Sequence, residues 1–72
     1  MNPEMQYVQS SSIEMVGYDA EAQQLHVTFK KTGTYVYGGV PPHVWDQLMA
    51  APSKGNFVNT IIKPSYPVAG RY

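Results

Sequence analysis

Polar and apolar residues alternate most regularly between Gln24 and Lys30. On one side lie Leu25, Val27 and Phe29, and on the other Gln24, His26, Thr28 and Lys30. A period of two residues is typical of a strand with one buried face. The pattern predicts a strand here, with His26 exposed on its polar face.

Two more segments with strand character flank it. Ser12–Asp19 alternates, with Ile13, Met15 and Gly17 on one face; Gly17 marks a bulge or a close backbone approach. In 34–37, Tyr35 and Tyr37 share a face opposite Val36. Gly33 suits the positive φ of the intervening hairpin turn. These strands predict an antiparallel meander, to which Tyr7 and Val8 could add a fourth strand.

The second half of the chain has helical spacing. After Pro42, apolar residues recur at Val44, Trp45, Leu48 and Met49, and Pro52 ends this helix. A second helix is predicted from the N-cap Ser53 to about Ile62, ended by Pro64. The predicted fold is α+β: a three- to four-stranded antiparallel β-meander followed by two short helices packed on one face. The predicted core is Ile13, Leu25, Val27, Phe29, Tyr35, Val40, Val44, Leu48, Phe57 and Ile61.

Length and composition set the domain organisation. Seventy-two residues make one small domain, which we place at 8–66, with flexible ends at 1–7 and 67–72. The absence of cysteine excludes disulfides and cysteine-ligated zinc. No apolar run reaches the roughly 18 residues of a membrane span. We expect a soluble cytoplasmic monomer.

The net charge is zero, which argues against strong non-specific binding to nucleic acid. The charges are nevertheless uneven, because residues 1–29 contain four acidic and no basic residues, whereas 47–72 contain three basic and no acidic ones. Either two faces are solvated by chance or a polar partner surface matches this asymmetry.

Residues suited to catalysis are sparse. His26 and His43 are expected to be exposed and non-catalytic, and no further metal ligands occur at a fitting spacing. The serines at 10–12 lack a nucleophile-elbow context. We therefore expect a protein that is not an enzyme and that has no cofactor or metal.

Two motifs have both a structural and a binding interpretation. Ser53-Lys54-Gly55 could form an anion site at a helix N-terminus, or simply an N-cap with a small residue kept for packing. Tyr35 and Tyr37 could stack on nucleobases or lie in the core beneath the helices. For each motif, the sequence alone does not decide between the two interpretations.

An ordered set of residues spans roughly 8–66. It comprises Ser12-Ile13, Val16-Gly17-Tyr18-Asp19, Leu25-x-Val27-x-Phe29, Gly33-x-Tyr35-x-Tyr37, Val40-Pro41, Val44-x-x-x-Leu48, Ala51-x-Ser53-x-Gly55, Asn59, Ile62 and Tyr66. This set resembles the KTSC family, named for a module at the C-terminus of some lysyl-tRNA synthetases. The resemblance implies a small α+β fold, and the position beside a synthetase suggests RNA binding.

The whole chain also resembles a small lytic-phage transcription regulator that binds the host RNA polymerase. That resemblance implies a non-catalytic protein that inhibits initiation or promotes antitermination through protein–protein contact in the host bacterial cytoplasm. The candidate partner-binding residues are Tyr7, Lys54, Lys63, Tyr66 and Arg71.

The alternative function is an RNA- or tRNA-binding accessory module of the lysyl-tRNA synthetase C-terminal type. Its candidate residues are Lys30, Lys31, Lys54 and Lys63 on phosphates, with Tyr35 and Tyr37 stacking on bases. Such binding would weaken steeply with salt.

Overall fold

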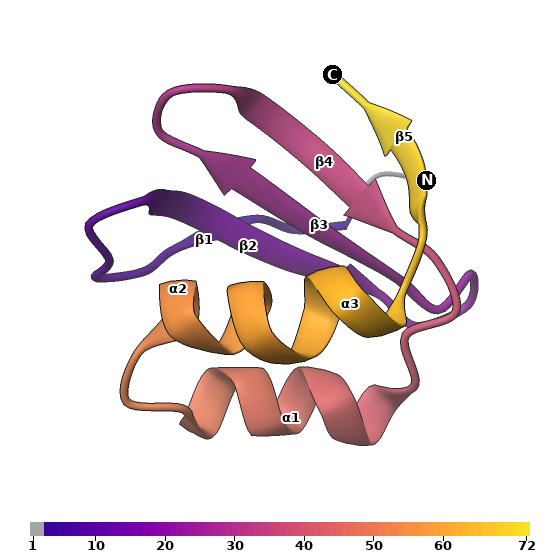
Figure 1. Cartoon of the computed structure of the whole chain (residues 1–72). Helices are drawn as coiled ribbons and strands as arrows, with labels where there is room; N and C mark the ends of the chain where they lie inside the picture. The colour runs from indigo at the N-terminus through magenta and orange to yellow at the C-terminus, as the bar shows by residue number, and fades with distance from the viewer. Residues whose placement is uncertain (1–2) are drawn as a thin grey trace.

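The structure is a computed structural model, and it describes residues 3–72. Within this range a five-stranded antiparallel sheet packs against helices on one face, which confirms the α+β prediction (Figure 1). The strands are β1 (Gln6–Tyr7), β2 (Ile13–Asp19), β3 (Gln24–Phe29), β4 (Gly33–Tyr37) and β5 (Val68–Arg71). The helical segments are α1 (Pro42–Ala50), α2 (Lys54–Phe57), η1 (Val58–Ile62) and α3 (Lys63–Ser65).

The strand order in space is the order in sequence, β1-β2-β3-β4-β5. The predicted meander accounts for β2, β3 and β4, and Gly33 has the expected positive φ of 95°. The two edge strands come from outside the predicted domain 8–66, and β1 contains Tyr7, which was predicted as part of a possible fourth strand. β1 pairs with β2, and β5 returns after the helices to pair with β4. Gln6–Tyr7 and Val68–Arg71 are therefore paired with a neighbouring strand, and the flexibility of residues 1–7 and 67–72 stays a prediction from the sequence.

A bulge in β2 changes which of its residues face the core. The register shifts between Ile13 and Met15, and beyond it Val16 pairs with Val27 and Tyr18 with Leu25. Because an extra residue in one strand reverses the alternation, Ile13 shares the helix-covered face with Val16 rather than with Met15. The predicted face assignment of this strand is therefore wrong after Ile13. The bulge lies at the start of the strand, and not at Gly17.

Gly17 instead marks the close approach that was its alternative interpretation. A Cβ on this residue would lie 2.5 Å from the Met5 Sδ and 2.9 Å from the Glu4 carbonyl oxygen. The segment before β1 thus crosses the outer face of the sheet, the face without helices, directly over Gly17.

The second helix is continuous but contains a wide turn. In η1 the hydrogen bonds are of the i→i+5 type, and the Lys63 N–H donates to the Val58 carbonyl. Pro64 follows at once, and a proline ring in a regular α-helix clashes with the carbonyl four residues earlier. The wider turn relieves this conflict, so the helix continues to Ser65 instead of ending at Pro64.

The core lies between the sheet and the two helices. Its buried members are Ile13, Val16, Leu25, Val27, Tyr37, Val40, Val44, Leu48, Val58 and Ile62. Three predicted core residues, Phe29, Tyr35 and Phe57, are only partly buried against this cluster. The prediction of Ile61 is wrong, because its side chain is 42% exposed and Ile62 is buried in its place.

Candidate functional site

Basic and aromatic side chains gather where β3 ends and β4 begins. We call this surface the basic–aromatic face; it comprises Phe29, Lys30, Lys31, Tyr35, Lys63 and Arg71. The strand pairing builds it, because Phe29 lies opposite Gly33, and Tyr35 lies opposite Arg71 of β5. Three stretches of the chain thus contribute to one surface: the β3–β4 hairpin, α3 and β5.

The two aromatic rings of this face each support a cation. The Lys63 Nζ lies 4.9 Å from the centre of the Phe29 ring, and the Arg71 Cζ lies 5.3 Å from the centre of the Tyr35 ring. The rings themselves meet edge to face at 5.5 Å between centres. Cation–π contacts of this length are attractive by about 0.5–1 kcal/mol at exposed sites. The rings therefore hold two long, flexible side chains in place.

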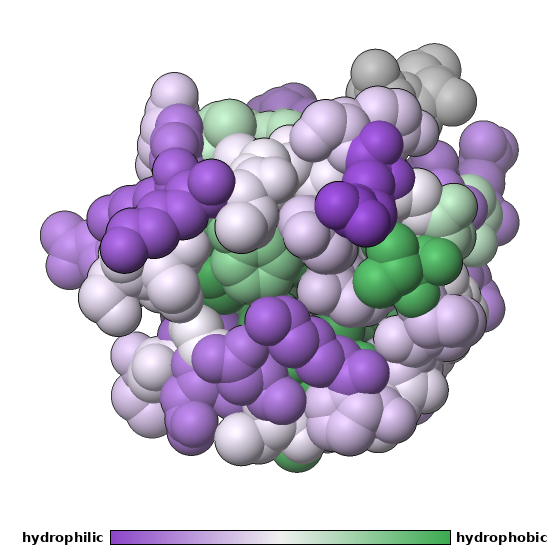
Figure 2. All heavy atoms as spheres, turned by 45° about the horizontal axis from the view of Figure 1, so that its top comes forward, coloured by the Kyte–Doolittle hydropathy of each residue, from purple (hydrophilic) through white to green (hydrophobic). Residues whose placement is uncertain are grey.

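A hollow of about 350 Å³ opens on this face. Its walls are Ser11, Ser12, Phe29, Lys30, Lys31, Thr32 and Lys63. Three lysines and three residues with hydroxyl groups thus line one hollow, and ammonium and hydroxyl groups can donate hydrogen bonds to an anion. Figure 2 shows the molecule turned from the view of Figure 1; strongly hydrophilic residues flank smaller hydrophobic areas.

The positive charges of the protein gather on the basic–aromatic face. Four of the five Lys and Arg residues of the sequence lie on the basic–aromatic face. Asp19 and Glu21 lie at the turn between β2 and β3, which is the opposite end of these strands from the Lys30–Thr32 turn. A neutral protein therefore presents a locally basic surface, which the net charge alone conceals.

The remaining predicted site residues lie elsewhere. The Lys54 ammonium donates to the carbonyl oxygens of Met49 and Ala51, at 2.9 and 2.7 Å, and so caps the end of α1. Tyr37 is buried in the core, with 2% of its surface exposed. Tyr66 is partly buried against the same core, whereas Tyr7 on β1 is 76% exposed. None of these three tyrosines is among the residues that line the hollow.

Ser53 acts as an N-cap, which is the structural interpretation of its motif. Its hydroxyl accepts a hydrogen bond from the Asn56 N–H at 3.3 Å, as an N-cap does. Gly55 is buried, and a Cβ there would lie 2.9 Å from the Ser12 Oγ and 3.2 Å from the Ser10 Oγ. The glycine is thus small because the β1–β2 connection packs against this helix turn.

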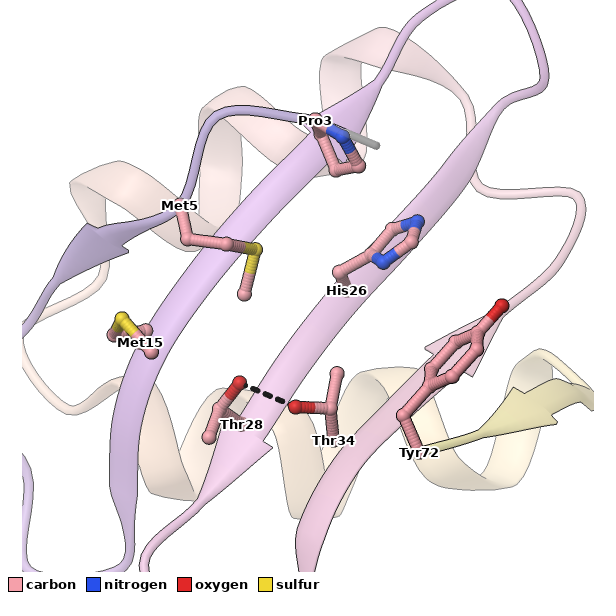
Figure 3. A pocket seen from close by; sticks show the side chains of 7 residues that line it. All are labelled: Pro3, Met5, Met15, His26, Thr28, Thr34 and Tyr72. Atoms are coloured by element: carbon pink, nitrogen blue, oxygen red, sulfur yellow. Dashed lines mark hydrogen bonds between the residues drawn. The ribbon is translucent and has the colours of Figure 1, made fainter. Parts of the chain in front are cut away.

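A second hollow, which we call the outer cleft, lies on the face of the sheet that the helices leave uncovered (Figure 3). It measures about 350 Å³ and is lined by Pro3, Met5, Met15, His26, Thr28, Thr34 and Tyr72. Met5 stands on one side of the cleft and Tyr72 on the other, with His26 between them. The hydroxyl groups of Thr28 and Thr34 are hydrogen bonded to each other at 2.7 Å across β3 and β4.

His26 differs from its prediction. It was expected to be exposed, but only 8% of its surface is accessible. The reason is that the segment before β1 and the end of the chain at Tyr72 rise on either side of the outer face. Burial lowers the pKa of His26, and the Asp19 carboxylate opposes this effect only in part. The imidazole is therefore neutral near pH 7, with one nitrogen as donor and the other as acceptor.

Residues 3–72 contain no group of three or more His, Cys, Asp and Glu side chains that could hold a metal ion. No helix in that range has the length and apolar character needed to cross a bilayer.

The KTSC domain model matches residues 9–66 of this chain. The chain belongs to the KTSC family. The crystal structure of a KTSC domain protein from Yersinia pestis superposes with a TM-score of 0.93, at 35% identity, over 99% of both chains. The family resemblance drawn from the sequence is thereby confirmed.

Relatives of the KTSC chain include proteins of similar length and one much larger enzyme. A protein from Tsukamurella paurometabola is 52% identical over 62 residues, which is 86% of this chain and 92% of that protein. An uncharacterized protein from Stutzerimonas stutzeri is 42% identical over 59 residues, 82% of this chain and 83% of that protein. A lysine–tRNA ligase from Nostoc punctiforme is 36% identical over 58 residues, 81% of this chain but only 10% of the ligase.

These matches bear differently on the two functional predictions. Their names mention neither a phage protein nor RNA polymerase, so they give no support to the resemblance to a phage transcription regulator. The ligase match does place a KTSC-like segment within a protein that acts on tRNA.

The sequence indicated part of this surface and missed the rest. Lys30, Lys31, Lys63, Tyr35 and Arg71 were all among the predicted site residues. Phe29 was assigned only to the core, although its place at the end of a strand beside two lysines is a signal that its ring could be half exposed. The outer cleft was missed because its side walls come from the two chain ends, where no regular pattern predicts a position.

Proposed function

We propose that this KTSC domain is a non-catalytic RNA-binding module whose basic–aromatic face contacts the phosphate backbone. The observation that carries the proposal is the set of four cations on one face, two of them held in place by aromatic rings. Phosphate contacts from Lys and Arg supply most of the affinity of non-specific RNA binding. The ligase relative supports the same class of partner.

The cation–π contacts change the role first suggested for the tyrosines. One face of the Tyr35 ring is covered by Arg71, and the buried Tyr37 cannot reach a ligand. A base that stacked on Tyr35 from this side would displace the guanidinium. The rings therefore position cations, and recognition on this face is of the backbone rather than of base identity.

The test is fluorescence anisotropy with a labelled single-stranded RNA of mixed sequence at low salt. We expect Lys63→Gln to weaken binding about fivefold, the equivalent of about 1 kcal/mol. Gln47→Glu is the matched control, because it changes the net charge by the same amount at an exposed position of α1. No binding by the unmodified protein, or an equal loss in both variants, would contradict the proposal.

Binding to RNA polymerase remains a prediction from the sequence, because no particular feature of the structure favours it. Affinity capture from bacterial lysate separates the two functions. Recovery of the large polymerase subunits after nuclease treatment would favour the polymerase, whereas RNA that is lost on nuclease treatment would favour the module proposed above.

A further inference from the structure

An RNA strand held on the basic–aromatic face needs a place for its bases. The Phe29 and Tyr35 rings each have one face covered by a cation, and they otherwise pack against each other and the core. Bases of a bound single strand usually stack on aromatic or apolar side chains and hydrogen bond through their edges. A hollow with such walls is therefore the feature to look for next to this face.

The outer cleft has these walls. Its sides are the Tyr72 ring, which is 81% exposed, and the thioether of Met5, with Met15 further along the sheet. Thioethers are polarizable and adapt to the face of a flat ring. Its volume of about 350 Å³ lies within the range of about 300–1,000 Å³ typical of small-molecule sites.

The floor of the cleft provides hydrogen-bonding groups that are already arranged. The mutual hydrogen bond of Thr28 and Thr34 uses one hydroxyl proton, so the pair keeps one further donor and free acceptor lone pairs. The His26 ring lies between the Met5 and Tyr72 walls, and its neutral form adds one donor and one acceptor. Adjacent donors and acceptors without formal charge match the edge of a nucleobase.

The two surfaces meet at β5. Arg71 pairs with Tyr35 and so lies on the basic–aromatic face, while the next residue, Tyr72, forms a wall of the outer cleft. An RNA strand that crosses this edge of the sheet passes from one surface to the other between the adjacent residues Arg71 and Tyr72.

We propose that the outer cleft binds an unpaired nucleobase of the RNA, between Met5 and Tyr72 and above the hydroxyl pair of Thr28 and Thr34. This inference rests on the proposed RNA binding, but its ligand carries no phosphate. The two can therefore be tested apart.

The experiment titrates the four ribonucleosides, without phosphate, into protein labelled with ¹³C at the methionine methyl groups and the histidine rings. We expect saturable shifts of the Met5 and Met15 methyl signals and of the His26 ring for at least one nucleoside. The Met49 methyl on α1 should stay unchanged, and so should all signals when ribose alone is added.

Two variants make the assignment specific. Tyr72→Ala removes an exposed ring and should weaken nucleoside binding at least threefold without unfolding the protein. Thr34→Val keeps the side-chain shape, removes the hydroxyl group and should weaken binding to a similar extent. A control, Tyr7→Ala, removes a similarly exposed ring outside the cleft and should have no effect.

The outcomes separate the two proposals. If RNA binds through Lys63 but no nucleoside shifts Met5, Met15 or His26, the cleft proposal is wrong and the RNA-binding proposal stands. If nucleosides bind in the cleft but Lys63→Gln behaves like Gln47→Glu toward RNA, the phosphate-binding face is wrong. Nucleoside shifts that Tyr72→Ala leaves unchanged would also overturn the cleft proposal.

Discussion

Tyr18 shows how one hydroxyl group joins the sheet to the start of α1. Its OH donates to the carbonyl oxygen of the buried residue Val40 at 2.6 Å, and its ring stacks on Trp45 at 5.6 Å between centres. In Tyr18→Phe the carbonyl loses this donor while the ring packing remains. A buried acceptor without a partner costs about 1–3 kcal/mol, so we expect a loss of that size in the free energy of unfolding.

Urea denaturation measures this loss. Tyr7→Phe is the matched control, because the Tyr7 ring is exposed and the same atom is removed there. Equal stabilities of the two variants would show that the Tyr18 hydroxyl contributes nothing.

His26 gives the protein a pH-dependent stability. Its pKa is lowered in the folded state by burial, whereas the unfolded chain has a value of about 6.5. Between these two values the unfolded state binds more protons, so the free energy of unfolding rises with pH. The contribution of His26 is thus present above about pH 6.5 and is lost as the pH falls through the folded-state pKa.

The predicted pH dependence can be measured by urea denaturation at a series of pH values, together with an NMR titration of the His26 ring. We expect His26→Gln to flatten the dependence below about pH 6.5, and His43→Gln to retain it. An unshifted NMR titration of His26 would contradict the assignment.

At the scale of elements, the segment before β1 depends on the missing side chain at Gly17. In Gly17→Ala the new methyl group would meet the Met5 Sδ at 2.5 Å and the Glu4 carbonyl at 2.9 Å. A backbone atom cannot move aside as a side chain can, so the segment must lift from the sheet, at a cost of about 1–3 kcal/mol.

Hydrogen exchange at the Val8 amide reports this change, because that amide donates to the Glu14 carbonyl at 3.2 Å. The exchange should accelerate in Gly17→Ala. In the control Gly38→Ala the added methyl meets only the Ala69 Cβ, at 3.5 Å, so exchange at Val8 should be unaffected. The same rate in both variants would refute the close approach.

The element scale also explains what the sequence could and could not predict. Regular alternation from Leu25 to Phe29 and helical spacing from Val44 to Leu48 predict β3 and α1 correctly, because local periodicity shows which face of each packs on the core. The bulge after Ile13 adds a residue that no period anticipates. β5 is short and mostly exposed, so its order comes from backbone pairing with β4, which side-chain patterns do not record.

For the whole molecule, the separation of charge predicts a measurable salt dependence. If the four cations of the basic–aromatic face contact phosphates, log K for single-stranded RNA should fall against log salt with a slope of about −3, since each contact contributes about −0.7. Lys63→Gln should make the slope less steep by about 0.7. Lys54→Gln should leave it unchanged, because that ammonium caps α1.

Anisotropy titrations at several salt concentrations provide these slopes. A slope near zero would mean that the cations do not contact phosphate. Equal changes in the Lys54 and Lys63 variants would mean that only net charge matters, and not the arrangement of the face.

The pairing of β5 with β4 has a consequence for fragments of this domain. The Gly38 N–H donates to the carbonyl oxygen of Pro67, and Thr34 exchanges two backbone hydrogen bonds with Tyr72. A fragment that lacks 67–72 would leave the donors and acceptors of β4 open beside the buried side chain of Val36. Open strand edges of this kind recruit strands from other molecules. Such a fragment should self-associate through β4, so the closing strand protects the protein from aggregation as well as shaping its surface.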